Sequence, residues 1–223
     1  MAQEIASHAR FVESIVDRLA DLLHDPADPL LRDELGAFIH SQLATSYFGL
    51  SYADSDYPDF WPIFNQAFNC LAPNPDDVYL ITPIRDDGVY RLSGHRGSVR
   101  VLDFQLGNSP LVNEGREPFG PTLANYDLDT ASIGADGTFE IIICAQRQNG
   151  YPGDWWQIPA GGNYLLARMR AYDWHTEIDG RLAIERLDRP AVKPRGAKTI
   201  DSERIAAWVE NWARFSINWA RNY

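Results

Sequence analysis

Acidic and basic side chains recur on stretches of this sequence that alternate like β-strands, and such residues can carry acid–base chemistry. Asp103 lies on one stretch, and Arg91 and Arg168 lie on two others. A buried arginine needs a carboxylate partner because an unpaired buried charge costs several kcal/mol. Asp103 could act as a base, an arginine could stabilise a developing oxyanion, and Tyr172 could donate a proton. The catalytic candidates are therefore Asp103, Arg168, Tyr172 and Arg91, with a structural ion pair as the alternative.

Further polar and aromatic residues on or beside the same stretches are candidates for binding a substrate. A pocket with a polar floor and aromatic walls suits a flat, hydrophobic small molecule. Phe119 and Tyr172 would complete the aromatic walls. The predicted substrate-binding residues are Asn74, Asp76, Tyr79, Gln105, Trp155, Trp156 and Arg170.

Other chemistries lack the residue spacing that they require. The five histidines show neither the i, i+4 spacing of a helical metal site nor i, i+2 spacing on a strand. We therefore expect no metal and no other cofactor, although histidines distant in sequence could still converge. The sequence contains no Gly-x-Ser-x-Gly elbow and no Gly-x-x-x-x-Gly-Lys phosphate loop. A glycosidase-type carboxylate pair stays open, with Asp103 facing Asp76 or Glu140.

Charge and composition restrict the partners of the protein. The 223 residues carry a formal net charge of −11. Phosphate backbones and anionic membrane surfaces attract basic faces, so we expect neither nucleic acid nor a membrane as a partner. No apolar run approaches the roughly 20 residues of a membrane span, and the N-terminus lacks the features of a signal peptide. A cytoplasmic protein with a small-molecule ligand is expected.

The stretch from 164 to 187 is predicted to position the two later arginines. Residues 164–172 alternate, with an apolar set on one side and Arg168 and Arg170 on the other. Asp179-Gly180 is the strongest short hairpin signal in the chain, and residues 181–187 would return beside the first strand. We expect a hairpin whose arginine-bearing face is either solvated or the wall of a pocket.

The rest of the chain predicts strands enclosed by helices. The expected fold is α+β: an antiparallel β-sandwich or jelly roll with N-terminal helices packed on it and a C-terminal amphipathic helix. Short turns suggest that the strands follow in meander order. Period-two patterns mark strands at 78–84, 89–94, 98–106, 125–133 and 139–147, and helical patterns cover 4–24, 28–47, 59–68 and 201–221. The predicted parts are a helical segment at 1–70, a sandwich at 71–190, and a connector with a helix at 191–223. Within the sandwich, the loop at 107–121 is long enough to form a lid or a rim.

The last predicted helix carries a wide apolar stripe that includes Trp208, Trp212 and Trp219. A stripe of this kind usually joins the intramolecular core. The alternative is a homodimer interface, because tryptophan is enriched where subunits meet.

Several short motifs occur in an order that resembles a known family. The motifs are NPDDVYL, YRLSGHRG, VLDFQLG, FEIII, WWQIP and LLARMRAYDWHTE followed by LAIERL. Over about residues 71–188 they resemble the bacterial domain-of-unknown-function 1214 family, which implies a jelly-roll sandwich and no assigned activity.

The candidate residues and the apolar stripe leave three hypotheses for the function. The first is a cofactor-independent lyase, hydrolase or isomerase acting on a hydrophobic or aromatic molecule. The others are a non-catalytic module that binds a small ligand or glycan, and a dimeric interaction protein.

Overall fold

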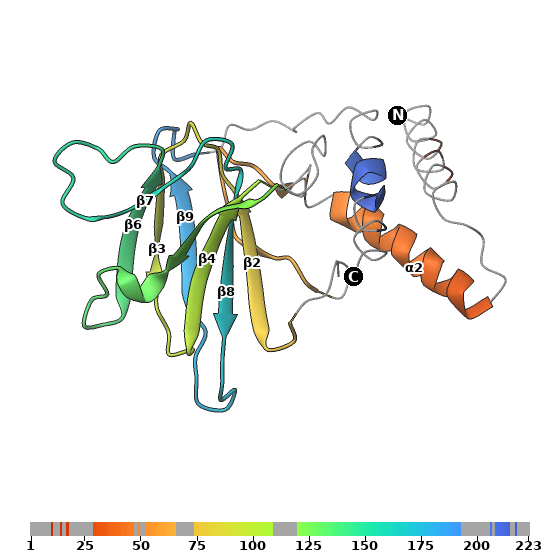
Figure 1. Ribbon diagram of the computed structural model, residues 1–223, viewed down its shortest axis with the longest axis horizontal. Helices are drawn as coiled ribbons and strands as arrows, with labels where there is room; N and C mark the ends of the chain where they lie inside the picture. Colours follow the sequence, from red (N-terminus) through yellow and green to blue (C-terminus); the bar gives the residue numbers. More distant parts are fainter. Residues whose placement is uncertain are drawn as a thin grey trace.

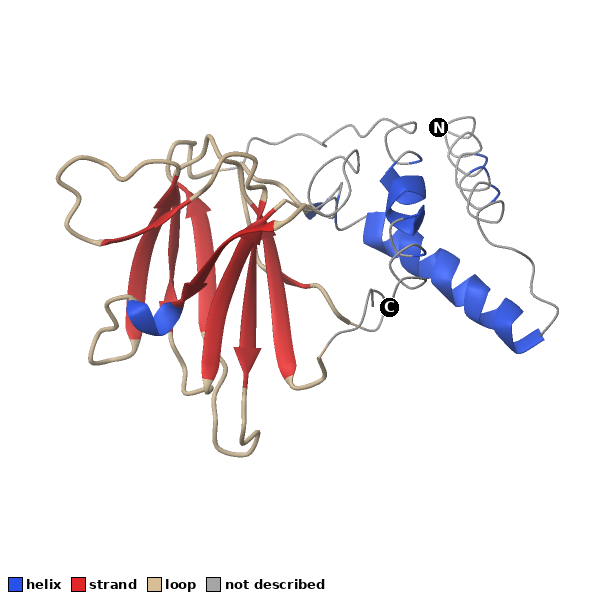
Figure 2. Cartoon of the chain, viewed as in Figure 1, coloured by secondary structure: helices blue, strands red, loops and turns tan. Residues whose placement is uncertain are grey.

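Two β-sheets face each other across a hydrophobic core, and helices lie to the side of the sandwich (Figures 1 and 2). This computed structural model describes residues 29–46, 52–65, 74–108 and 120–192. It also describes residues 10, 14, 17 and 49. Residues 206, 208–214 and 217 are described as well, and they belong to a C-terminal helix. Phe119, most of the predicted helix at 4–24 and most of the predicted lid at 107–121 lie outside the described residues.

Sheet A has five strands in the order β1, β2, β8, β4, β5, and sheet B has four in the order β7, β6, β3, β9. Neighbouring strands are antiparallel except β6 and β7, which are parallel. The predicted α+β class, a β-sandwich with flanking helices, is confirmed. The bounds are β1 Trp61–Pro62, β2 Asp77–Pro83, β3 Tyr90–His95, β4 Val101–Gly107, β5 Thr122–Asp127, β6 Thr138–Cys144, β7 Asp154–Gln157, β8 Tyr164–Arg170 and β9 Arg181–Arg186, with helix α2 Pro29–Ser46 and a 3-10 turn η2 Leu128–Thr130.

The order of the strands differs from the predicted meander. Strands β2, β3 and β4 follow one another in sequence, but β3 lies in sheet B while β2 and β4 lie in sheet A. The turns between them therefore carry the chain from one sheet to the other. The meander prediction was wrong because turn residues mark where a chain reverses without specifying the strand beside which it returns.

The turn at Asp179-Gly180 also connects the two sheets and does not close the predicted hairpin. Strand β8 pairs with β2 and β4, whereas β9 pairs with β3. The backbone N–H of Ile178 donates to Ser98 Oγ, and its carbonyl accepts from the N–H groups of Ser98 and Val99. Gly97 permits this docking, since its φ is +67° and an added Cβ would lie 2.3 Å from the Ile178 carbonyl oxygen. The hairpin prediction was wrong because these contacts are remote in sequence from the turn.

The space between the sheets holds the main core. Leu165, Ala167 and Met169 of β8 are buried there, as their alternation predicts. Phe104 of β4 and Trp156 of β7 belong to the same cluster. The inward face of β8 is thus entirely apolar, and its polar residues lie on the opposite, outer face of sheet A.

A second hydrophobic cluster covers one end of that outer face. Tyr164 and Leu166 of β8 pack there with Trp208 and Trp212 of the C-terminal helix, and three side chains of α2 pack against the cluster. Both tryptophans are fully buried within the chain, so this part of the predicted stripe forms intramolecular core. The next outer-face residues along β8 are Arg168 and Arg170, where the polar part of the face begins.

Helix α2 confirms the prediction for 28–47, but the predicted helix at 59–68 is wrong at its start. Trp61 and Pro62 form β1, which pairs with Ile81 and Leu80 of β2. A proline has no N–H to donate to a ladder and is tolerated at the edge of a sheet, where β1 lies. The apolar spacing that suggested a helix here fits this edge segment equally well.

Candidate functional site

Six residues form what we term the polar face, the part of the outer face of sheet A beyond the helical cover. Cross-strand register places Arg168 of β8 between Tyr79 of β2 and Asp103 of β4. It also places Arg170 opposite Asp77 of β2. Five of the predicted site residues are therefore brought together. The polar face consists of Asp77, Tyr79, Asp103, Gln105, Arg168 and Arg170.

Asp77 and Arg170 form a closed ion pair at the edge of the polar face. Arg170 Nε and Nη2 donate to the two carboxylate oxygens at 2.5 and 2.8 Å, and Tyr79 Oη donates to Asp77 Oδ2 at 3.1 Å. Burial by itself would raise the pKa of Asp77, but the hydrogen bonds from Arg170 and Tyr79 outweigh it, and the pKa lies below its usual range. This carboxylate is fully engaged, and its role is to fix Arg170 and Tyr79.

Asp103 and Arg168 face each other without forming a hydrogen bond. Asp103 Oδ1 lies 3.9 Å from Arg168 Nη1, which is beyond hydrogen-bonding distance. Oδ1 is buried, and among the described residues it has no hydrogen-bond partner. Burial raises the pKa of Asp103 above its usual value, and the attraction of Arg168 only partly offsets this. Asp103 Oδ1 therefore lacks a hydrogen-bond donor, and the guanidinium of Arg168 beside it is too distant to serve as one.

The guanidinium of Arg168 is held in place by a neutral side chain. Its Nη2 donates to Gln105 Oε1, and Gln105 Nε2 donates to Tyr164 Oη at 2.6 Å. Tyr164 is buried in the cluster beneath the helices, which anchors this chain of hydrogen bonds. Because this partner is an amide, it does not neutralise Arg168, and the facing carboxylate of Asp103 lies 3.9 Å away. A ligand oxygen placed between Arg168 and Asp103 could accept from the first and donate to the second.

Arg91 and Trp155 do not reach the polar face, and both predictions for them were wrong. Arg91 on β3 pairs across the outer face of sheet B with Glu185, and Glu140 lies 3.6 Å from its Nη1. Trp155 belongs to the same outer face and donates from Nε1 to Cys144 Sγ at 3.3 Å. Glu140 is thereby excluded as a carboxylate partner of Asp103. Alternation fixed the side of the strand on which these residues lie, but not the sheet to which the strand belongs.

Trp156 and Tyr172 are also misplaced by the prediction. Trp156 is buried between the sheets, where its ring stacks on Tyr126 with the centroids 4.8 Å apart. Tyr172 is 70% exposed and lies beyond the end of β8, four residues from Arg168 or roughly 13 Å along an extended chain. Trp156 cannot form an outer wall and Tyr172 is too remote to donate a proton at Asp103.

Asn74 and Asp76 lie just before β2 and contact different parts of the structure. The backbone N–H of Asn74 donates to Tyr79 Oη at 3.3 Å, so this residue supports the polar face from its edge. Asn74 Oδ1 accepts from the N–H of Asp76 at 3.1 Å and fixes the turn. Asp76 itself lines a separate groove at the end of the sheet.

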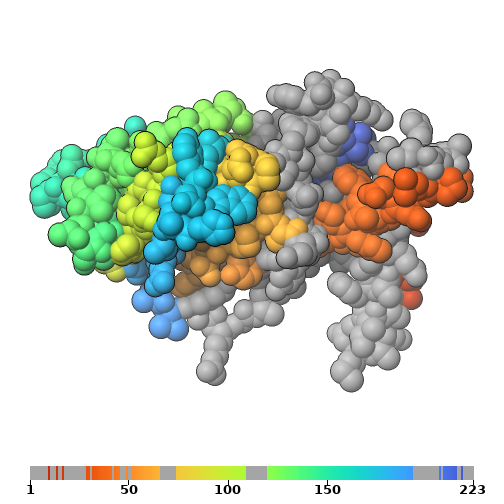
Figure 3. All heavy atoms as spheres, turned by 90° about the horizontal axis from the view of Figure 1, so that it is seen from below, coloured from red at the N-terminus to blue at the C-terminus, as the bar shows by residue number. Residues whose placement is uncertain are grey.

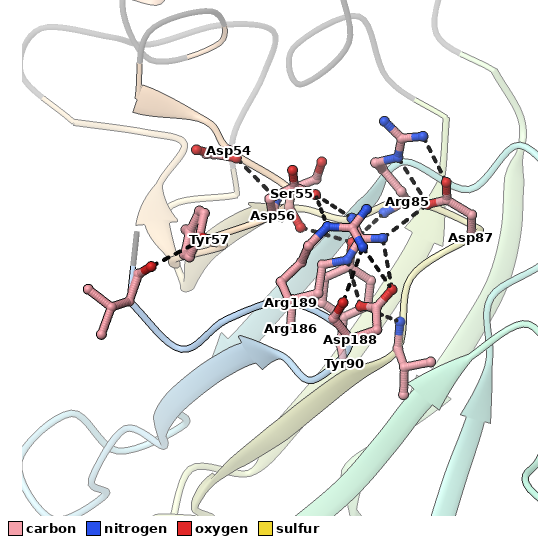
Figure 4. Close-up of polar contacts among 12 residues, drawn as sticks. Asp54, Ser55, Asp56, Tyr57, Arg85, Asp87, Tyr90, Arg186, Asp188 and Arg189 are labelled. Carbon is pink, nitrogen blue, oxygen red and sulfur yellow. Dashed lines mark hydrogen bonds and ion pairs between the residues drawn. The ribbon is translucent and has the colours of Figure 1, made fainter. Parts of the chain in front are cut away.

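Sequence reasoning missed a cluster of charges around Arg186, at the end of β9 (Figure 4). Arg186 Nε lies 2.7 Å from Asp188 Oδ1, Nη1 lies 2.6 Å from Asp56 Oδ1, and Nη2 lies 3.3 Å from Asp87 Oδ1. The side chain is 1% exposed and lies over the ring of Tyr90 at 5.5 Å. The alternation of β9 gave no signal for it, because two of its three partners, Asp56 and Asp87, are distant in sequence.

The Arg186 cluster has the properties of a structural anchor. Tyr90 Oη donates to the carbonyl of Ser55 at 3.0 Å, so ring and cation together fasten the 52–60 segment to sheet B (Figure 4). Burial raises the pKa of Tyr90 to about 12. Each guanidinium nitrogen of Arg186 meets a carboxylate. The cluster therefore fastens parts of the fold together, in contrast to Arg168, whose guanidinium does not contact a carboxylate at hydrogen-bonding distance.

The described part of the chain has neither a metal-binding cluster nor a membrane-spanning helix. There, no group of three or more His, Cys, Asp or Glu side chains is arranged to hold a metal ion. No helix within the described ranges combines the length and apolar character that crossing a membrane requires.

Comparison with solved structures finds a similar fold in an uncharacterized protein. A crystal structure of an uncharacterized protein from Burkholderia cenocepacia is similar with a TM-score of 0.77 and 25% sequence identity, covering 99% of this chain and 61% of that one. The chain thus spans about three fifths of that protein. The VPA0106 protein from Vibrio parahaemolyticus has a TM-score of 0.38 and 13% identity, covering 76% of this chain and 44% of that one. No protein-family model and no curated protein matches the sequence.

Proposed function

We propose that the polar face binds a small molecule and moves a proton on it without a cofactor. Asp103 is the base, and Arg168 holds the oxygen on which negative charge develops. The observation that carries this proposal is the 3.9 Å separation of Asp103 Oδ1 and Arg168 Nη1. A hydroxyl or water oxygen that bridged these atoms would donate to Asp103 and accept from Arg168, and a small movement of the side chains would be needed to expose the buried Oδ1 to it.

The surroundings of the pair suit this division of roles. Burial raises the pKa of Asp103, and a carboxylate with a higher pKa is a stronger base. Arg168 is fixed by Gln105 before any ligand arrives, so little reorganisation is needed when charge develops beside it. The closed Asp77–Arg170 pair supplies a rigid border on one side.

The proposed reactions are those in which a base removes a proton while an oxygen gains charge. Abstraction of a proton next to a carbonyl leads to isomerisation or elimination, and activation of a water leads to hydrolysis. Trp155 and Trp156, two of the aromatic residues that suggested a flat hydrophobic ligand, lie away from this face. We therefore propose a substrate rich in carbonyl, carboxylate or hydroxyl groups. The resemblance to the domain-of-unknown-function 1214 family remains a proposal for the fold and adds no activity.

The test is a search for turnover by proton NMR in D₂O. Small hydroxy acids, keto acids and esters are incubated with the protein, and deuterium exchange, isomerisation, elimination or hydrolysis is followed directly. We expect a transformed compound whose turnover is lost in Asp103→Asn and kept in Glu140→Gln, the control that removes a carboxylate from sheet B. Turnover that survives Asp103→Asn overturns the proposal. A compound that binds the polar face unchanged would favour the non-catalytic binding module instead.

A further inference from the structure

A groove of about 260 Å³ lies at the end of the sandwich, between the start of β2 and the loop at 171–180. Figure 3 shows this loop, in blue, standing beside the yellow residues that begin β2. The groove is distinct from the polar face, although Asp77 contributes to the walls of both. Its volume is below the range of pockets for drug-sized ligands and suits a small group.

The apolar part of the groove includes an exposed indole. Trp174 is 67% exposed, and Met169 and Val78 line the groove with it. The loop that carries Trp174 is ordered by its own contacts. Asp173 accepts hydrogen bonds from the N–H of His175 and the hydroxyl of Thr176. An exposed aromatic ring on an ordered loop offers a face on which a ligand can stack without first ordering the backbone of the loop.

The polar part of the groove is made of carboxylates. Asp77 is neutralised by Arg170, and Glu177 Oε2 accepts from the backbone N–H groups of Arg100 and Tyr172 at 3.0 Å. Asp76 and Asp179 differ from these two, because within the described residues their side chains make no hydrogen bond or ion pair. Among the described residues that line the groove there is no lysine or arginine. Two negative charges without a cation therefore flank the exposed indole.

We propose that this groove binds a small organic cation, an ammonium group with an apolar body. The indole face attracts a cation within about 6 Å of its centroid, and the carboxylates of Asp76 and Asp179 attract it over a longer range. The walls contain many hydrogen-bond acceptors and, apart from the indole N–H, lack side-chain donors. A neutral sugar needs both donors and acceptors, so the lining favours a cation over a glycan. This site does not depend on chemistry at Asp103.

The probe that tests the site is choline, compared with 3,3-dimethylbutan-1-ol, its neutral isostere, and with glucose. Binding to the intact chain is measured by calorimetry at low and high salt. We expect choline to bind and its isostere to bind at least tenfold more weakly. Added salt should weaken the binding of choline and leave the binding of the isostere unchanged. Trp174→Ala should weaken choline binding at least tenfold, and Asp179→Asn should weaken it severalfold.

Matched controls separate the groove from the rest of the surface. Tyr172→Ala removes a neighbouring exposed aromatic that does not line the groove, and Glu140→Gln removes an exposed carboxylate elsewhere; both should bind choline as the parent does. Trp174 is exposed, so its alanine variant should keep the melting temperature of the parent. Equal binding of choline and its isostere, preferential binding of glucose, no binding up to ~10 mM choline, or unchanged binding by Trp174→Ala would each overturn the proposal.

Discussion

Asp103 and Arg168 lie opposite each other on β4 and β8, with Oδ1 and Nη1 3.9 Å apart and no hydrogen bond between them. Arg186 shows the contrasting arrangement, since each of its nitrogens meets a carboxylate and the side chain is 1% exposed. Arg186 thus has a carboxylate at every nitrogen, whereas Arg168 lies beside a carboxylate oxygen that has no hydrogen-bond donor among the described residues. The predictions below rest on this difference.

Asp103→Asn should leave the protein as stable as the parent, or slightly more stable, at pH 7. The pKa of Asp103 is raised by burial, so the folded state favours the protonated form. The resulting stability is present below the usual pKa of 3.8 and is lost as the pH rises through the folded pKa. At pH 7 the ionised carboxylate therefore opposes folding weakly, because the side chain is 40% exposed. Urea unfolding at pH 7 measures this, and a loss above about 1 kcal/mol would identify a structural ion pair.

Arg186→Met should be far more damaging than Arg168→Met. Removing Arg186 leaves three carboxylates without their shared cation, and removing one partner of a buried pair costs about 3–5 kcal/mol. Removing Arg168 leaves Gln105 bonded to Tyr164 and should cost about 1 kcal/mol or less. The free energies of unfolding of the two variants in urea decide the matter. Equal losses would mean that Arg168 also serves as a structural anchor.

The Arg186 cluster should make the protein sensitive to acid. The hydrogen bond from Arg186 lowers the pKa of Asp188, and that from Arg85 lowers the pKa of Asp87. A depressed folded pKa gives stability that is present above the usual value of 3.8 and is lost as the pH falls through the folded pKa. Melting temperatures measured from pH 5 to about pH 2 should fall more steeply for the parent than for Arg186→Met. Parallel curves would show that these carboxylates do not depend on Arg186.

Trp212→Ala should unfold the outer cover of sheet A without changing the assembly state. Trp212 is fully buried and its ring lies 6.0 Å from that of Trp208. Replacing a buried tryptophan by alanine costs about 3–5 kcal/mol. Thermal unfolding measures the loss, and native mass spectrometry measures the mass of parent and variant. A dimer that dissociates in the variant, with little change in subunit stability, would restore the interface interpretation.

The sequence predicted the local features of the molecule better than its long-range ones. Helix α2 and the inward burial of Leu165, Ala167 and Met169 follow from periodicity alone, which depends on neighbouring residues. The sequence left either Arg91 or Arg168 as the partner of Asp103, and the structure places Arg168 opposite it on the neighbouring strand of sheet A. Arg91 has the same kind of alternating context and lies in sheet B, so pattern could not separate it from Arg168.

The missed features share a dependence on distant parts of the chain. Arg186 is buried by residues near 56 and 87, and nothing in the pattern of β9 indicates that a charged residue there is buried. The Asp179-Gly180 turn has the local chemistry of a hairpin, yet bonds between Ile178 and Ser98 direct the chain to the other sheet. Which sheet a strand joins is decided by such contacts, and local turn chemistry does not encode them.

The most direct measurement compares Asp103→Asn with the parent on a compound that the parent transforms in D₂O. General base catalysis contributes about 10²–10⁴-fold, so we predict a fall in kcat of that size with little change in the affinity for the compound. Glu140→Gln should match the parent. Turnover that is unchanged in Asp103→Asn would contradict the proposal that Asp103 is the base, and loss of binding together with stability would assign Asp103 to the fold.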